Sequence, residues 1–285
     1  MRHAFLVIAH TEYDVLQTLI ELLDNPCCDI YIHIDKKSKL PNILKASYAR
    51  IFLLKKRIDT RWGHVSLIKT EMLLFETALA NGPYEYYHLL SGTDLLIKPL
   101  DYFFDFFNKY KGKEFVGFSS KNDTSDKVMR YRFGIRYYKM KGRCVTYLKL
   151  LCYRLERIAD KLHKRSDESF KKGSEWVSIT EDFCSYLVGK KHWIFRRFRY
   201  TFCGDEIFLQ TVLWNSPYRA NIYSLDNEFN GCLREIIWEN DNPHVWGSSP
   251  NDIDYLQKSN KFFARKFSSA YPDIIKEVQK MVKIK

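Results

Sequence analysis

The sequence predicts an α/β protein in which helices flank a mostly parallel central sheet. Short apolar runs of strand length alternate with longer stretches of helical periodicity in the N-terminal part of the chain. Such alternation predicts a parallel sheet, because each intervening helix carries the chain back to the same edge. Of the 285 residues, 46% are hydrophobic, which is enough for a large packed core.

The N-terminal part contains four candidate strands and two candidate helices. The strands are expected at residues 4–9, 29–35, 50–55 and 86–90, and the helices at residues 12–24 and 65–79. Ligands of parallel sheets bind outside the carboxyl ends of the strands. His10, Asp35 and the Ser-Gly-Thr-Asp turn that ends at Asp94 fall at those ends.

Residues 136–172 form a basic segment. It holds 12 Lys and Arg against four Asp and Glu, a difference of +8 within a net charge of +12 for the chain. Its apolar residues share one helical face: Leu148, Leu151, Cys152, Leu155, Ile158, Ala159 and Leu162. Two interpretations stay open, namely a surface helix that packs this face on the core, or a basic amphipathic helix that rests on anionic lipid.

Capping residues predict three helix starts further along the chain. Thr180 precedes two acids and is expected to be an N-cap, and residues 205–214 form a helix that begins with Asp205 and Glu206. Ser249 and Pro250 fit the N-cap and the first position of a third helix.

Several function classes are weakened by what the chain lacks. The strand-to-helix turn at residues 9–12 has no glycine, so a dinucleotide fingerprint or P-loop is not expected. Seven cysteines without a C-x-x-C spacing indicate a reduced, cytosolic chain. The apolar run at residues 4–9 is too short for a signal peptide or a membrane span. We therefore expect a protein that is soluble or held to a membrane from outside.

Two adjacent cations, Arg265 and Lys266, lie inside the apolar aromatic stretch 262–267. Desolvating them is costly unless an anion meets them, and a guanidinium beside an ammonium suits a diphosphate. The alternative is a partly exposed strand whose two cations point at water.

One reaction in which a diphosphate leaves is sugar transfer from a nucleotide donor. Besides cations for the diphosphate, this reaction needs a base that deprotonates the acceptor hydroxyl, and Glu206 is the candidate. The alternative for Glu206 is an ordinary helix start. Asp252-Ile253-Asp254 matches a metal-binding Asp-x-Asp by its letters, but it falls in the first helical turn after Ser249 and Pro250. We therefore expect no metal, with Arg265 and Lys266 as the substitute counter-charge.

Eight ordered segments resemble glycosyltransferase family 14, the core-2/I-branching β-1,6-N-acetylglucosaminyltransferases and protein O-xylosyltransferases. The similarity covers roughly residues 3–270 and leaves mainly residues 136–172 without a close match. The segments are residues 31–38, 61–63, 88–94, 173–176, 205–208, 233–238, 249–252 and 262–267. The resemblance implies a GT-A-like fold in one domain, residues 1–285, with a nucleotide-binding half to about residue 120 and an acceptor and catalytic half beyond it.

The resemblance further implies an inverting, metal-independent transferase without a cofactor. It would move a sugar, expected to be N-acetylglucosamine, from a UDP-sugar to a glycan or lipid-linked glycan. Glu206 aligns with the family's base, Arg265 and Lys266 with the residues that hold the UDP diphosphate, and Asp35 with a uridine contact beside His10. The expected donor or acceptor sugar contacts are Asp94, Glu175, Trp176, Trp238 and Arg130.

The departures from the family bear on donor and location. Trp246 lies near the position where animal branching enzymes carry an additional arginine, and residues 249–267 look more like the xylosyltransferases. The donor could therefore be UDP-xylose. The lack of the Golgi members' anchor and disulfides suggests a bacterial, cytoplasmic enzyme, peripheral at the inner face of the membrane. A non-catalytic membrane- or nucleic-acid-binding protein is the alternative, although base-stacking motifs are lacking and no nucleic-acid partner is expected.

Overall fold

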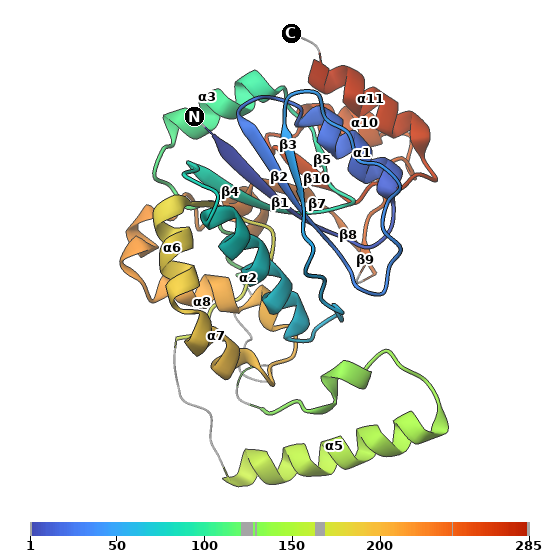
Figure 1. Ribbon diagram of the computed structural model, residues 1–285, viewed down its shortest axis with the longest axis vertical. Helices are drawn as coiled ribbons and strands as arrows, with labels where there is room; N and C mark the ends of the chain where they lie inside the picture. The colour runs from blue at the N-terminus through green and yellow to red at the C-terminus, as the bar shows by residue number, and fades with distance from the viewer. Residues whose placement is uncertain (1, 121–127, 129, 163–168, 241, 284–285) are drawn as a thin grey trace.

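The computed structural model describes residues 2–120, 128, 130–162, 169–240 and 242–283. A five-stranded sheet of order β3-β2-β1-β4-β6 forms its centre (Figure 1). Its strands are β1 (His3–Ala9), β2 (Cys28–Ile34), β3 (Arg50–Leu53), β4 (Tyr86–Ser91) and β6 (Ser178–Thr180). The first four are parallel and β6 runs antiparallel to β4. The predicted strands and the mostly parallel α/β class are confirmed.

Two smaller sheets extend this framework. One has the order β5-β10-β7 and joins β5 (Leu95–Leu96), β10 (Phe263–Arg265) and β7 (Arg234–Ile236). The other pairs β8 (Trp238–Glu239) with β9 (Asn242–Pro243). Because β10 pairs with β5, the stretch 262–267 lies beside the turn that follows β4, and the Phe267 amide donates to the Thr93 carbonyl at 2.9 Å.

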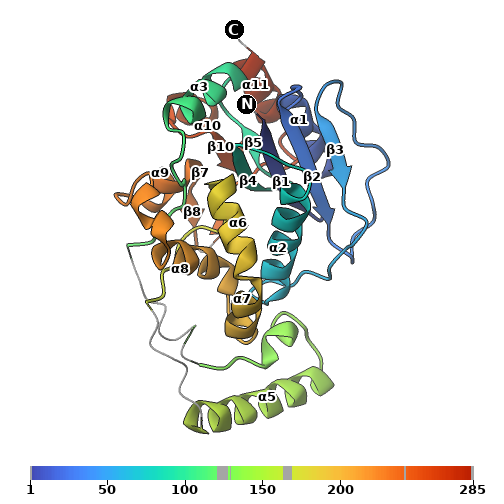
Figure 2. The ribbon, with the colours of Figure 1, turned by 60° about the vertical axis from the view of Figure 1, so that its left-hand side comes forward.

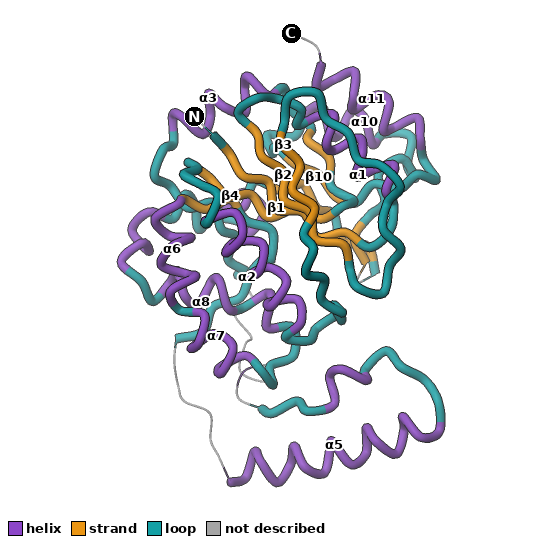
Figure 3. The backbone as a smooth tube through the Cα atoms, in the orientation of Figure 1, coloured by secondary structure: helices purple, strands orange, loops and turns teal. Residues whose placement is uncertain are grey.

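Helices cover both faces of the central sheet, as the orange strands between purple helices show (Figure 3). Phe5, Val7 and Ala9 of β1 share a core with the first group of helices, and Ala4 and Leu6 share a second core with the other group. The first group is α1 (Tyr13–Leu22), α3 (Leu100–Lys109), α10 (Asp252–Lys258) and α11 (Pro272–Lys283). The second is α2 (Ser66–Leu79), α6 (Glu181–Gly189), α7 (Lys191–Phe198) and α8 (Phe208–Trp214).

Shorter elements complete the chain, and they include the turn that carries Glu206. They are α9 (Glu228–Cys232) and the 3₁₀ helices η1 (Gly134–Tyr137), η2 (Gly204–Glu206) and η3 (Pro217–Asn221). The predicted cap of α6 is confirmed, because the Thr180 hydroxyl accepts from the Phe183 amide at 3.2 Å.

The basic segment forms α5 (Arg143–Leu162), which lies apart from the main body in both views (Figure 1, Figure 2). The interpretation that its apolar face packs on the core is wrong. Leu148, Cys152 and Ala159 are half-buried on the side toward η1, but the rest of the face is exposed: Leu151, Leu155, Ile158 and Leu162. Residues 163–168 of the predicted segment lie outside the described residues. Within the described part, no helix combines the length and apolar character needed to cross a membrane.

Two predicted helix starts are wrong by a few residues. Asp205 and Glu206 lie in η2, and α8 begins only at Phe208, because the chain passes through Cys203 in a left-handed conformation (φ 49°) and Ile207 is not helical (φ −130°). Helix α10 begins at Asp252, with Asn251 as its N-cap residue in place of Ser249.

Candidate functional site

The carboxyl ends of β1, β2 and β4 form one edge of the sheet, as predicted. The Asp35 amide donates to Ala9 O and the Gly92 amide to Ile8 O, each at 2.9 Å, so the residues after these strands are tied together. Gly92 has to be glycine there, since a Cβ would lie 2.6 Å from Ala9 Cβ. The predicted grouping of His10, Asp35 and Asp94 at this edge is therefore confirmed as a matter of position.

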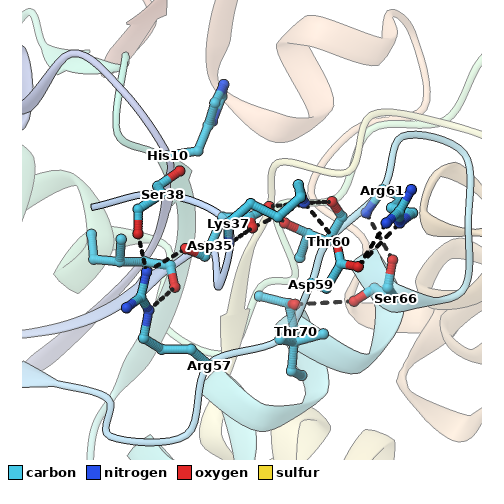
Figure 4. Close-up of polar contacts among 12 residues, drawn as sticks. His10, Asp35, Lys37, Ser38, Arg57, Asp59, Thr60, Arg61, Ser66 and Thr70 are labelled. Atoms are coloured by element: carbon cyan, nitrogen blue, oxygen red, sulfur yellow. Dashed lines mark hydrogen bonds and ion pairs between the residues drawn. The ribbon is translucent and has the colours of Figure 1, made fainter. Parts of the chain in front are cut away.

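Asp35 is held in place by its own polar network (Figure 4). Its carboxylate accepts from the Lys37 amide at 2.8 Å, from Lys37 Nζ at 2.8 and 2.9 Å, and from the Thr60 hydroxyl. Burial opposes ionisation, but these hydrogen bonds lower the pKa of Asp35. An ionised, fixed carboxylate thus lies at the same edge as the exposed ring of His10.

Arg265 brings three distant parts of the chain together: its own strand, the turn at Asp94 and the pair Glu175-Trp176. Its Nε lies 3.4 Å from Asp94 Oδ1, its Nη1 lies 3.8 Å from Glu175 Oε1, and its guanidinium carbon lies 4.4 Å from the centre of the Trp176 ring. Asp94 is positioned by the amide of Ser91 at 2.9 Å and by its hydroxyl at 2.7 Å. The predicted residues Asp94, Glu175, Trp176 and Arg265 therefore form one cluster.

Further carboxyl groups lie around this cluster, and they influence the pKa values of its acidic side chains. Burial, and then the charge of Asp205, raise the pKa of Glu175 to about 8, although Arg265 acts in the opposite direction. Burial also raises the pKa of Glu71 well above its usual value, with further contributions from Glu175 and Asp205. Neither carboxyl oxygen of Glu71 has a hydrogen-bond partner among the described residues. Glu175 is therefore mainly protonated at neutral pH.

Glu206 lies near these acidic residues. It contributes to the raised pKa of Glu175, and its Oε2 lies 3.3 Å from Lys172 Nζ. Its side chain is 34% exposed, so an acceptor could reach it. The Gly173 amide donates to the Glu206 carbonyl at 2.9 Å, and a Cβ on Gly173 would come within 1.9 Å of Gly117 O. The segment 173–176 thus fixes Glu206 and supplies Glu175.

Comparison with known families shows to which family the chain belongs. The sequence model described as "Branch: Core-2/I-Branching enzyme" matches residues 3–255. The chain belongs to the core-2/I-branching enzyme family. This membership agrees with the predicted GT-A-like class, while the sheet itself confirms the α/β part of that prediction.

Individual relatives of this core-2/I-branching family member are distant. Xylosyltransferase oxt of Drosophila melanogaster is 25% identical over 272 residues, and that of Drosophila pseudoobscura pseudoobscura is 26% identical over 272. Each alignment covers 87% of this chain but only 30% or 29% of the relative, so the chain spans less than a third of these proteins. The apo crystal structure of mouse xyloside xylosyltransferase 1 is 9% identical with a TM-score of 0.42, covering 92% of this chain and 96% of the mouse chain.

The charge of Lys266 acts on a different carboxylate from those beside Arg265. Burial opposes the shift, but hydrogen bonds from two serines and the charge of Lys266 lower the pKa of Glu12. Glu12 immediately precedes α1, so Lys266 lies near the carboxyl end of β1. The charges of Arg265 and Lys266 therefore act on different carboxylates.

Trp238 and Arg130 do not belong to the buried part of the site. Trp238 lies on β8 and is 54% exposed, and Arg130 is exposed in the loop that precedes η1. Their contacts with sugar stay predictions.

The Asp-x-Asp sequence at residues 252–254 has a local structural role. Asp252 accepts from His244 Nε2 at 3.0 Å and from the amides of Gly247 and Ser249 at 2.6 and 3.2 Å. It therefore fixes the loop before α10. Across the described residues, no group of three or more His, Cys, Asp or Glu is arranged to hold a metal ion.

Glu71 and Lys172 were missed by sequence reasoning. Glu71 lies three residues after Ile68 and four before Phe75, on the buried face of α2. A carboxylate on an otherwise apolar helical stripe was the available signal. For Lys172 no such signal exists, since it is one of many cations in the basic segment.

Proposed function

We propose that this protein transfers a sugar from a UDP-sugar to a hydroxyl of a glycan or lipid-linked glycan, with inversion and without a metal ion. The observation that carries the proposal is the cluster of Asp94, Glu175, Trp176 and Arg265 beside Glu206. Membership of the core-2/I-branching family supports it. The residues come from segments that are far apart in sequence, which argues for a functional site over independent structural features.

In the proposed reaction, Glu206 takes the proton of the acceptor hydroxyl. The hydroxyl oxygen attacks the sugar C1 from the face opposite UDP, and the bond from C1 to the diphosphate oxygen breaks with its electron pair. Arg265 and Lys266 stabilise the charge that develops on the departing diphosphate. Lys172, 3.3 Å from Glu206 Oε2, orients the base.

The other site residues take supporting parts in this proposal. A protonated Glu175 donates a hydrogen bond to a sugar hydroxyl, which an ionised carboxylate cannot do. Trp176 is 5% exposed and lies under the guanidinium of Arg265, so it positions that cation. The exposed face of Trp238 suits a pyranose ring. Asp35 and His10 receive the nucleoside.

The donor has two candidates, UDP-N-acetylglucosamine and UDP-xylose. The first follows from the branching enzymes in the family, and the second from the two Drosophila relatives, which are named xylosyltransferases. UDP release measured with UDP-GlcNAc, UDP-xylose, UDP-galactose and UDP-glucose decides between them. A donor preference outside the first two would overturn this part of the proposal.

The decisive experiment on the mechanism is Glu206→Gln, with Glu277→Gln on the exposed surface of α11 as the matched control. General-base assistance contributes roughly 10²–10⁴ in rate, so transfer should fall by about that factor while UDP still binds. The control should retain full turnover. Undiminished transfer by Glu206→Gln would reject the assignment of the base.

The proposed setting is the bacterial cytoplasm, with the enzyme peripheral at the inner face of the membrane. The exposed side of α5 supports the membrane contact in this proposal, because an apolar stripe runs along the helix with cations beside it. The stripe is Tyr147, Leu151, Leu155, Ile158 and Leu162, and the cations are Arg143, Arg154, Arg157 and Lys161. A basic amphipathic helix of this kind suits the surface of an anionic bilayer.

A further inference from the structure

A cavity of about 1000 Å³ lies between the start of α2, the segment that leads into η1, and α7. Its lining is strongly basic, and no Asp or Glu is among the described residues that line it. The cations are Lys69, Arg132, Arg136, Arg196, Arg197 and Arg199.

Some of these cations have ion-pair partners in the protein. Arg136 lies 3.3 Å from Asp59, and Arg132 lies 3.9 Å from Glu156. Lys69 and Arg196 are exposed, and neither forms an ion pair within the described part of the chain. Several cations around one cavity repel each other and create a positive potential that attracts an anion.

The lining also carries aromatic side chains between the cations. Phe133 and Tyr200 meet edge to face at 4.8 Å, and the guanidinium of Arg199 lies 5.1 Å from the Tyr200 ring centre. The aromatic lining consists of Tyr131, Phe133, Trp193, Phe195 and Tyr200. Ligand pockets typically measure roughly 300–1000 Å³ and combine aromatic walls with a few polar groups. This cavity therefore has room for more than one sugar ring.

Backbone hydrogen bonds connect the wall of the cavity to the turn that carries Glu206. His64 lines the cavity, and the preceding residue Gly63 accepts a hydrogen bond from the Cys203 amide at 2.9 Å. The Cys203 carbonyl in turn accepts from the Glu206 amide at 3.3 Å. One wall residue of the cavity is thus the sequence neighbour of a residue that holds the turn of the proposed base.

We propose that this cavity is the acceptor subsite and that it binds an acidic oligosaccharide, whose sugars carry carboxylate or phosphate groups. The inference rests on the proposed function and names the class of its acceptor. The cations come from α2, from the segment before and within η1, and from α7 and the turn after it. Charges spread over separate walls suit several anionic groups on one chain, and the aromatic side chains suit the sugar rings between them.

The test is calorimetric titration of the UDP-saturated enzyme, so that the diphosphate site is already occupied. The probes are tetragalacturonate, the neutral maltotetraose of equal length, and geranyl diphosphate. We expect tetragalacturonate to bind at least tenfold more tightly than maltotetraose, with an affinity that falls as salt rises. Lys69→Glu and Arg196→Glu should each weaken this binding at least tenfold, whereas Lys45→Glu, an exposed loop lysine outside the cavity, should not.

Three outcomes would overturn the inference: equal affinity for the acidic and neutral tetrasaccharides, unchanged binding in both cavity variants, or tighter binding of geranyl diphosphate than of tetragalacturonate. Unchanged UDP affinity in the variants confirms that they fold, and Lys69→Gln repeats the test without adding a negative charge. Since binding is measured without turnover, Glu206→Gln should bind tetragalacturonate normally. A failure of the proposed base is therefore distinguishable from a failure of the subsite.

Discussion

Arg265 lies among carboxyl groups that do not all carry their charge. Asp94 and Glu175 are both within 3.8 Å of the guanidinium, and two ionised partners would neutralise it before any substrate arrived. Because the pKa of Glu175 is raised to about 8, this partner is mainly neutral at pH 7. Much of the positive charge of Arg265 thus stays available for a diphosphate.

Glu175 should make the stability of the protein depend on pH. Its pKa rises from an ordinary 4.5 to about 8 on folding, so between these values the folded state holds a proton that the unfolded state has lost. The contribution of Glu175 to the free energy of unfolding is therefore fully present below about pH 4.5. It declines as the pH rises toward 8, by at most about 1.4 kcal/mol for each pH unit. Glu175→Gln should flatten this slope, measured by urea unfolding across the window.

The slope should not vanish in Glu175→Gln, because Glu71 has a pKa shifted in the same direction. Glu277→Gln on α11 is the control and should leave the slope unchanged. Identical slopes for the wild type and Glu175→Gln would show that Glu175 is not the buried titrating group.

Lys266 should contribute directly to UDP affinity. A hydrogen bond to a charged group contributes about 1.5–3 kcal/mol, so Lys266→Ala should weaken UDP binding by roughly 10- to 100-fold. Lys258→Ala, at the exposed end of α10, is the control for a lost surface charge. Unchanged UDP affinity in Lys266→Ala would remove this residue from the diphosphate site.

At the scale of elements, the position of Glu206 depends on the turn η2 more than on the helix that follows it. Glu206 was expected to lie at a helix start, where the helix dipole would act on it. In the structure Glu206 is the last residue of η2 and Ile207 separates it from α8, and its position depends on the Gly173 amide and on Cys203. Neighbouring backbone segments thus set the geometry of the proposed base.

The exposed stripe of α5 should bind anionic membranes. Burying one leucine or isoleucine side chain contributes roughly 1.5–3 kcal/mol, so Leu151→Ser combined with Ile158→Ser should lower vesicle binding more than tenfold. Flotation with phosphatidylglycerol-containing vesicles, compared with purely zwitterionic ones, provides the measurement. Leu225→Ser, another exposed leucine, is the matched control. Equal flotation of wild type and double variant would exclude α5 as the contact.

At the scale of the whole molecule, the two predicted halves share a sheet. Strand β5 comes from the first half, whereas β7 and β10 come from the second. The pairing of β10 with β5 carries Arg265 to the turn after β4, and this turn lies at the edge where β1 and β2 also end. The boundary near residue 120 stays a prediction, but the site requires both sides of it.

Transfer should survive removal of divalent metals. The charge on the departing diphosphate is assigned to Arg265 and Lys266, so dialysis against EDTA should leave the initial rate within about twofold of the untreated enzyme, since no stabilising ion is lost. Loss of activity on chelation, restored by manganese, would overturn this assignment and return Asp94 or Asp252 to consideration as ligands.

Local patterns in the sequence determined the strands, most of the helices and the edge at which His10, Asp35 and Asp94 gather, because periodicity and chain direction alone place them. The eight segments also identified the family, which the match over residues 3–255 confirmed. Tertiary packing was needed to bring Glu71 close to Glu175, to place Arg265 beside Asp94 and Lys266 near Glu12, to leave the apolar stripe of α5 exposed and to form the basic cavity. Desolvation and charge interactions depend on which distant residues packing brings together, and no local pattern records that.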